Sequence, residues 1–225
     1  MDILTSLILI PVLTVLALLF CKELKNIRVI AAVGMTIQLL QAIRLVFIFM
    51  AERASGNDSE MILKKSYQWF DSINIQYAVG VDGISVLMIL LTGIIIFTGI
   101  FTSWKMEYLS KEFFISLIVL ATGVFGFFIS LDLFTLFLFY ELAVLPMYLL
   151  IGIWGTGKKE YSAMKLTLML MGGSAILLVG LLGIYFNSAP DGGQLTFNLL
   201  EIAKVTIPME AQRFFFPLTF IGFGV

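Results

Sequence analysis

The feature that most constrains this chain is a series of apolar runs, each about as long as a helix that crosses a bilayer. A helix rises about 1.5 Å per residue, so about 20 apolar residues span a hydrocarbon core of about 30 Å. The 225-residue chain is 60% hydrophobic and only 13% charged. A transmembrane β-barrel would instead show segments of about ten residues with alternating polarity. We therefore predict an all-α polytopic membrane protein.

Six complete spans and the start of a seventh are predicted within one membrane domain, residues 1–225. The second span contains Gln38, Gln41 and Arg44, the last near its end, where a long side chain can snorkel. Of the two long loops, the later one includes "LTFNLLEIAKV", which we expect to form an amphipathic surface helix. The predicted spans are 3–21, 27–50, 84–104, 113–131, 133–154 and 164–187, followed by an apolar run from 214 onward.

The composition excludes several kinds of site. The chain has one cysteine, Cys21, and no histidine, which rules out iron–sulfur clusters, histidine-ligated haem and Cys-based or Cys/His zinc sites within it. No GxGxxG or GxxxxGK pattern opens a helix after a strand. The net charge of -1 gives no argument for nucleic acid. We expect no cofactor and no metal here, so any redox chemistry must belong to another chain.

The distribution of basic residues predicts the orientation. The connections after the first, third and fifth spans carry eight lysines and arginines in short segments, against five in the two long loops on the other side. Cytoplasmic loops are enriched in basic residues, so the short connections are predicted to be cytoplasmic and the N-terminus outside. Asp2 stands where a signal peptide would be basic, which favours a retained first span.

Glu141 is the strongest candidate for chemistry. It lies nine residues after Asp132, which sits in a tight outer turn, so it is about 13 Å deeper and near the bilayer centre. An ionised acid there costs at least about 2.5 kcal/mol, and intramembrane acids commonly serve proton relays. The alternative is a protonated acid that only holds neighbouring helices together.

Pro146 interrupts the same run. A proline has no N–H, so the Leu142 carbonyl loses its helical partner and the helix bends. Unpaired backbone at this depth is tolerated only against protein or a wet cavity. Acid and kink together indicate a hydrated pocket, although an ordinary packing kink is the alternative. Tyr148, seven residues after Glu141 on the same helical face, is a candidate donor or an interfacial aromatic residue.

Other residues carry two interpretations each. Lys165 is a candidate cation of a proton path or a residue that snorkels to the surface. Asp82, followed by Gly83, is typical of a helix N-cap, with a direct proton role as the alternative. The pair Gly172 and Gly173 in "MGGS" favours close helix packing.

Three segments resemble a known family. "GVDGIS", "SLDLFTLFLFYELAVLPMYLLIGIWG" and "YSAMKLTLMLMGGS" are similar to the antiporter-like proton-channel subunits of bacterial respiratory complex I (NADH:quinone oxidoreductase), of the chain M type. That resemblance implies about fourteen helices with two inverted five-helix repeats, each containing a broken helix. Residues 1–110 would then be helices 1–3, and 111–225 the first part of the first repeat, with helices 4–6 and the start of a seventh.

The resemblance also assigns roles. It places Glu141 on the family's fifth-helix glutamate, which pairs with a lysine of the broken seventh helix. Lys165 matches a sixth-helix lysine, and Asp132 an acid at the outer end of the fifth helix. The sequence ends at "GFGV", before that seventh-helix lysine, so we expect a separate or missing C-terminal half.

The leading hypothesis is a proton-translocating membrane-arm subunit that couples quinone reduction to proton transport. FMN, iron–sulfur clusters and ubiquinone or menaquinone are then expected on other subunits, with neighbouring antiporter-like chains and lipid as partners, in a bacterial cytoplasmic membrane. The alternatives are a subunit of a multisubunit sodium/proton antiporter or membrane-bound hydrogenase, and a non-catalytic scaffold.

Overall fold

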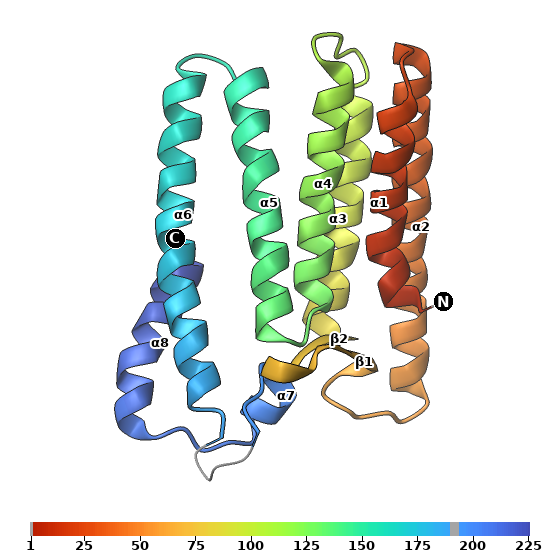
Figure 1. Ribbon diagram of the computed structural model, residues 1–225. Helices are drawn as coiled ribbons and strands as arrows, with labels where there is room; N and C mark the ends of the chain where they lie inside the picture. Colours follow the sequence, from red (N-terminus) through yellow and green to blue (C-terminus); the bar gives the residue numbers. More distant parts are fainter. Residues whose placement is uncertain (1, 190–193) are drawn as a thin grey trace.

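Six long helices stand side by side in the computed structural model, which describes residues 2–189 and 194–225 (Figure 1). Each is long and apolar enough to cross a membrane, so the prediction of six spans is confirmed. A further helix, α8 (Met209–Gly224), runs back alongside the sixth. The six are α1 (Ile3–Phe20), α2 (Leu24–Ala54), α3 (Gly83–Thr102), α4 (Ser110–Ile129), α5 (Leu133–Trp154) and α6 (Lys159–Phe186).

The observed helix bounds differ from the predicted spans mainly where polar residues continue a helix beyond its apolar part. Helix α5 has the predicted bounds. Helix α6 begins at Lys159, five residues before the predicted start, and α2 extends to Ala54. Lysine and glutamate are good helix formers, whereas hydropathy marks only the part of a helix suited to the membrane. The apolar pattern therefore locates the spans and underestimates the helices.

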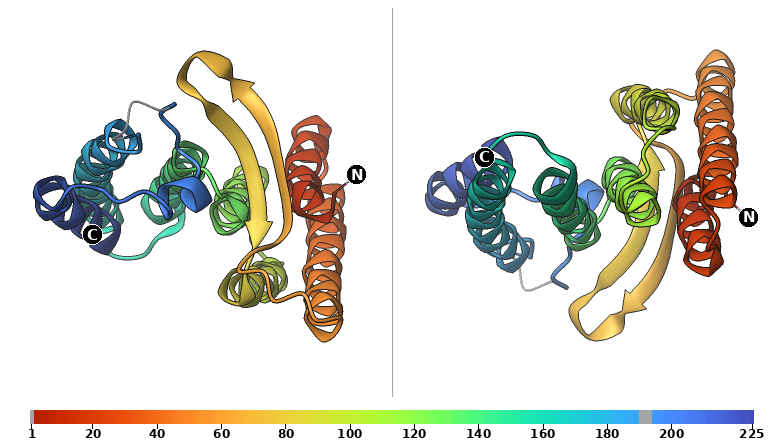
Figure 2. Two further views of the ribbon diagram at one scale, coloured as in Figure 1. Left: turned by 90° about the horizontal axis from the view of Figure 1, so that it is seen from below. Right: turned by 90° about the horizontal axis from the view of Figure 1, so that it is seen from above.

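A β-hairpin covers one end of the bundle, which the sequence analysis did not predict. Strands β1 (Ile62–Phe70) and β2 (Ile75–Val81) pair antiparallel and are joined by a short 3-10 turn, η1 (Asp71–Ile73). The all-α expectation is thus corrected for residues 62–81. Nearly every side chain of β1 is exposed, so the strand lacks the alternating burial that would have marked it. Figure 2 shows the hairpin lying across the helix ends; we call this side the hairpin end.

The connection between α4 and α5 is held between two extended segments at the hairpin end. The Leu131 N–H donates to the Ala78 carbonyl of β2 at 2.8 Å. On the other side, Leu133 N–H donates to the Phe197 carbonyl, and Leu199 N–H donates to the Leu131 carbonyl, both at 2.9 Å. The start of α5 is therefore fixed from both sides by backbone hydrogen bonds.

The amphipathic surface helix expected in "LTFNLLEIAKV" is mostly absent. Only α7 (Leu199–Ile202) is helical, because Phe197 and Leu199 form backbone hydrogen bonds with the α4–α5 connection. Asn198 begins α7, and its side-chain oxygen accepts a hydrogen bond from Leu200 N–H at 3.0 Å. A cap and a backbone pairing thus replace the first half of the expected helix.

Buried apolar side chains form two clusters. The larger joins α1, α2, α3 and α4, and the smaller joins α5 and α6 with Phe197. Figure 2 shows the same division, with α5, α6 and α8 on one side of α4 and α1 and α2 on the other. Helix α5 is therefore the boundary between a packed four-helix unit and the α6–α8 pair.

Helix α1 contains a proline whose backbone defect is repaired from α2. Pro11 cannot donate to the Leu7 carbonyl, and Leu7 is fully buried. The Gln38 side chain donates to that same carbonyl at 2.9 Å. Gln38 is itself 1% exposed. A polar residue in the second span thus supplies the hydrogen bond that the proline removes.

We predict that Gln38→Leu lowers the free energy of unfolding by about 1 kcal/mol, because it leaves the buried Leu7 carbonyl unpaired. In a Pro11→Ala background the same substitution should cost much less, since the alanine N–H can donate to the Leu7 carbonyl. The measurement is a denaturant titration in detergent, with Gln41→Leu as control, because Gln41 makes only a long 3.5 Å contact to Ser6. If Gln38→Leu lowered the free energy of unfolding equally in the wild-type and Pro11→Ala backgrounds, Gln38 would not replace the hydrogen bond that Pro11 removes.

Candidate functional site

Glu141 lies near the middle of α5, nine residues after the N-cap residue Asp132 in a helix of 22 residues. It is half-buried. One of its carboxyl oxygens, Oε1, is buried and has no hydrogen-bond partner among the described residues. A buried polar atom without a partner is costly, so such an atom marks a functional group or a missing ligand.

The packing of α5 on α6 sets the level of Glu141. A side chain added at Gly152 would meet Ala163 at 3.6 Å, and Phe137 and Leu178 line one cavity. Counting along two antiparallel helices from the Gly152–Ala163 contact places Glu141 level with Ser174. The "MGGS" segment of α6 therefore lies opposite the acid, in the middle of the bundle.

Helix α8 also reaches this level. A Cβ atom added at Gly173 would approach Val225 Cβ to 2.8 Å, tighter than real carbon contacts allow, so a side chain there would force Val225 to shift. The Phe223 ring packs against Tyr140 with centroids 6.3 Å apart and against Phe127 at 6.5 Å. The end of α8 therefore packs on α6 at Gly173 and reaches α4 and α5 through the Phe223 ring, beside Tyr140, the residue that precedes the acid.

Pro146 is buried in α5 and differs from Pro11 in one respect. The carbonyl that Pro146 leaves without its usual partner belongs to Leu142, and within the described parts of the chain no side chain donates to it. Next to it in sequence is Glu141, with its unpartnered oxygen. The Glu141 carboxyl oxygen and the Leu142 carbonyl are thus consecutive acceptors near the middle of α5 that receive no hydrogen bond from a side chain of the described residues. In α1, by contrast, Gln38 donates to the carbonyl that Pro11 leaves free.

The structure does not bring Tyr148 and Lys165 into contact with Glu141. Tyr148 is 44% exposed and makes no side-chain hydrogen bond within the described residues. Lys165 is exposed in the second turn of α6. By the α5–α6 register it is level with Leu150, about 13 Å from Glu141 along the helix axis. Neither is a direct partner of the acid in this arrangement.

Asp132 is fully buried and ties α5 to β2. Its Oδ1 accepts hydrogen bonds from Phe134 N–H at 3.0 Å and Thr135 N–H at 3.1 Å. Its Oδ2 accepts from Gln76 N–H at 3.2 Å. Burial raises the pKa of Asp132 and outweighs the N–H donors, which act in the opposite direction. The geometry is that of a helix cap that also fixes the hairpin.

Asp82 and the glycines have the surroundings of structural residues. The Asp82 carboxylate accepts from Ser85 N–H at 2.7 Å and so caps α3. Burial favours a higher pKa for Asp82, but these first-turn donors together lower it. Gly83 is the first residue of α3. On α6, Gly173 is the close contact to α8, whereas Gly172 has open space around its Cα.

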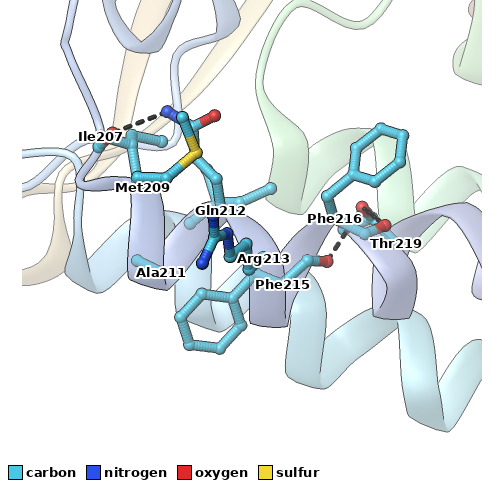
Figure 3. Close-up of a pocket in the computed structure, with 9 residues that line it drawn as sticks. Ile207, Met209, Ala211, Gln212, Arg213, Phe215, Phe216 and Thr219 are labelled. Carbon is cyan, nitrogen blue, oxygen red and sulfur yellow. Dashed lines mark hydrogen bonds between the residues drawn. The ribbon is translucent and has the colours of Figure 1, made fainter.

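Two grooves lie beside the site rather than on it. A groove of about 330 Å³ is lined by Gly123, Tyr140 and Phe223, among others, but not by Glu141. Another of about 390 Å³, shown in Figure 3, lies between α6 and the first half of α8, where Gln212 donates to the Ile207 carbonyl at 2.7 Å. No group of three metal-ligating side chains occurs within the described residues.

Sequence reasoning missed the aromatic residues and Ser174 around Glu141. Tyr140, Phe127 and Phe223 come from three helices, and no spacing in the sequence links them. Ser174, level with the acid, donates to the Met171 carbonyl at 3.1 Å. The sequence shows Tyr140 directly before Glu141, but an aromatic residue next to an acid does not by itself indicate a functional site.

The arrangement defines a class of helical membrane subunit with an acid in its core. Residues 130–225 match the family described as NADH:quinone oxidoreductase/Mrp antiporter, transmembrane. Over 99% of its length the chain is 30% identical to NAD(P)H-quinone oxidoreductase chain 4 2 of Trichodesmium erythraeum and 33% identical to chain 4 3 of a Picosynechococcus strain. The resemblance expected from the motifs is confirmed. The chain spans about two fifths of the length of these relatives.

Solved structures share the fold. Respiratory complex I from Thermus thermophilus contains a chain that matches 98% of this one with a TM-score of 0.81 and 19% identity, over 43% of that chain. An archaeal membrane-bound sulfane sulfur reductase contains a chain with a TM-score of 0.76, also at 19% identity, over 99% of this chain and 44% of that one. These likenesses establish the antiporter-like subunit fold.

We predict that Asp132→Ala lowers the free energy of unfolding by about 2 kcal/mol, because it removes the cap of α5 and leaves Gln76 N–H unpaired. Asp132→Asn should cost about half of that, since the amide keeps one acceptor oxygen for the cap. Denaturant unfolding and hydrogen exchange at the Gln76 amide measure both effects. Asp71→Ala is the control, because Asp71 is exposed in the hairpin turn. Wild-type stability of the alanine variant would refute this role.

Proposed function

We propose that this chain is part of a proton-translocating membrane subunit of an NADH:quinone oxidoreductase-type complex, in which quinone reduction drives proton transport. The observation that carries the proposal is Glu141, an acid near the bilayer centre with a buried oxygen that lacks a partner among the described residues. It follows Tyr140, which packs against Phe223 of α8, and precedes Leu142, whose carbonyl Pro146 leaves without its helical donor. The similarity to oxidoreductase chain 4 supports the same assignment.

The chemistry follows from the low dielectric around the acid. Charges interact several times more strongly there than in water, so the approach or withdrawal of a cation would change the energy of a carboxylate at Glu141 strongly. Lys165 is too far along the helix to be that cation. The partner we propose is a lysine on another segment, as the resemblance implies. Moving that lysine would then release or bind one proton at Glu141.

We further propose how the chain is placed. Its short basic connections would face the cytoplasm of a bacterial inner membrane, with the N-terminus and the hairpin end outside. FMN, iron–sulfur clusters and quinone would be held by other subunits, and neighbouring antiporter-like chains would be its partners. Residues 1–110 would form the helices that precede the first inverted repeat. Residues 111–225 would form the first part of that repeat.

A second candidate is a subunit of a multisubunit sodium/proton antiporter. The matched family includes Mrp antiporters, and the same acid would serve either function. The relatives named chain 4 favour the oxidoreductase. The third candidate is a scaffold without a proton role. Glu141 would be dispensable for transport in this case and not in the other two.

We predict that Glu141→Gln lowers proton translocation by about tenfold or more, because glutamine keeps the size and polarity of the side chain but cannot ionise. The measurement is proton uptake by membrane vesicles after addition of NADH, with assembly followed on native gels. Glu160→Gln is the matched control, since Glu160 is exposed at the start of α6. Normal pumping by an assembled Glu141→Gln complex would support the scaffold instead.

Pro146→Ala should lower proton translocation several-fold while leaving assembly intact. Alanine supplies an N–H to the Leu142 carbonyl and so removes one of the acceptors that make the region polar. Pro11→Ala is the matched control, because Gln38 already occupies the carbonyl freed in α1. The same vesicle assay applies, and unchanged pumping in Pro146→Ala would show that the kink serves packing only.

A further inference from the structure

An apolar groove of about 390 Å³ runs between α1 and α2. Residues Ile10 and Ala17 mark its extent on α1, seven residues or about 10 Å apart. Val29, Val33 and Ile37 line the other side and are 43%, 52% and 45% exposed. The groove therefore opens sideways, at the depth where hydrocarbon surrounds a membrane protein.

The groove offers no polar group that needs water. Its one hydroxyl, that of Thr14, donates to the Ile10 carbonyl of its own helix at 2.8 Å. Thr14 also packs directly against Gly34, which brings the two helices close at the floor of the groove. An occupant would consequently be apolar along its length and held by shape and dispersion.

One end of the groove leads to the turn between α1 and α2, which is basic. Lys25 lies one helical turn from Val29, on the same face of α2, and Lys22 follows the last residues of α1. Both are exposed, and neither forms an ion pair within the described residues. The acid of this turn, Glu23, accepts a hydrogen bond from Asn26 at 3.0 Å.

One further basic side chain, Lys111, reaches the same turn from α4, whereas Arg28, in the second turn of α2, reaches the connection between α3 and α4. Lys111 Nζ donates to the Leu19 carbonyl at 2.6 Å, and Arg28 Nη2 donates to the Met106 carbonyl at 3.0 Å. The acceptors in both contacts are neutral carbonyls, so neither contact pairs the side chain with a carboxylate. The turn thus combines three cations, Lys22, Lys25 and Lys111, at the end of an apolar groove.

We propose that this groove binds one acyl chain of an anionic phospholipid, whose phosphate headgroup lies against Lys22 and Lys25. A lipid matches both features at once: an apolar chain at hydrocarbon depth and a negative group at its end. Basic residues at the membrane surface attract anionic lipids. A helix of a neighbouring subunit would fit the apolar groove but gives no reason for the unpaired lysines.

The test uses the protein extracted in mild detergent together with the subunits that stay bound. Native mass spectrometry counts the dioleoyl phosphatidylglycerol and phosphatidylcholine molecules retained. We expect a preference for phosphatidylglycerol that falls about 25-fold in Lys22→Gln/Lys25→Gln, because each of the two basic side chains near an anionic lipid contributes a factor of about five. Lys64→Gln/Lys204→Gln removes two exposed lysines elsewhere and should leave the preference unchanged.

A second variant and a crosslink test the groove itself. Ala17→Phe fills it from an exposed position and should reduce retention of both lipids while the melting temperature stays near that of the wild type. Phosphatidylglycerol with a photoreactive acyl chain should label residues 10–17 and 29–37 above other apolar helix faces. Equal labelling of all faces, crosslinks from the groove to another subunit, or wild-type retention in either variant would overturn the proposal.

Discussion

The structure depends on one constraint: a backbone or side-chain polar group inside hydrocarbon must find a partner within the protein. Two prolines in long helices show the two ways of meeting it. At Pro11 the freed Leu7 carbonyl receives the Gln38 amide from the next helix, which joins α1 to α2. At Pro146 no side chain of the described residues fills the freed position. The first defect is a structural tie, and the second leaves polarity beside an acid.

The same constraint explains why the hairpin end is built from extended backbone. The α4–α5 connection is short and buried, so its N–H and carbonyl groups cannot be left to water. Strand β2 and the segment 195–199 supply the partners on its two sides. Asp132 adds a carboxylate that accepts three backbone N–H groups from both α5 and β2. The start of the helix that carries Glu141 is therefore fixed by both backbone and side-chain hydrogen bonds.

The sequence predicted the parts that depend on local hydropathy and failed where partners come from far along the chain. Apolar length located all six spans, and the residue count from Asp132 placed Glu141 at mid-depth. The hairpin was missed because the exposed strand β1 shows no alternating burial. The expected surface helix near Leu199 was replaced by a pairing between residues 131 and 197–199, which no local pattern encodes. Likewise, the role of Gln38 is invisible without knowing that it faces Leu7.

Around Glu141, glycine determines the geometry. Leu177 packs directly on Gly222, and Gly180 approaches Thr219, so α6 and α8 interlock along several turns. This close packing brings the end of α8 to the level of the acid and sets the Phe223 ring against Tyr140. A side chain at Gly173 would push α8 away. A partner group held at the end of α8 would be positioned relative to Glu141 by the contact between α6 and α8. The small residues of α6 would therefore set how closely that partner approaches the acid.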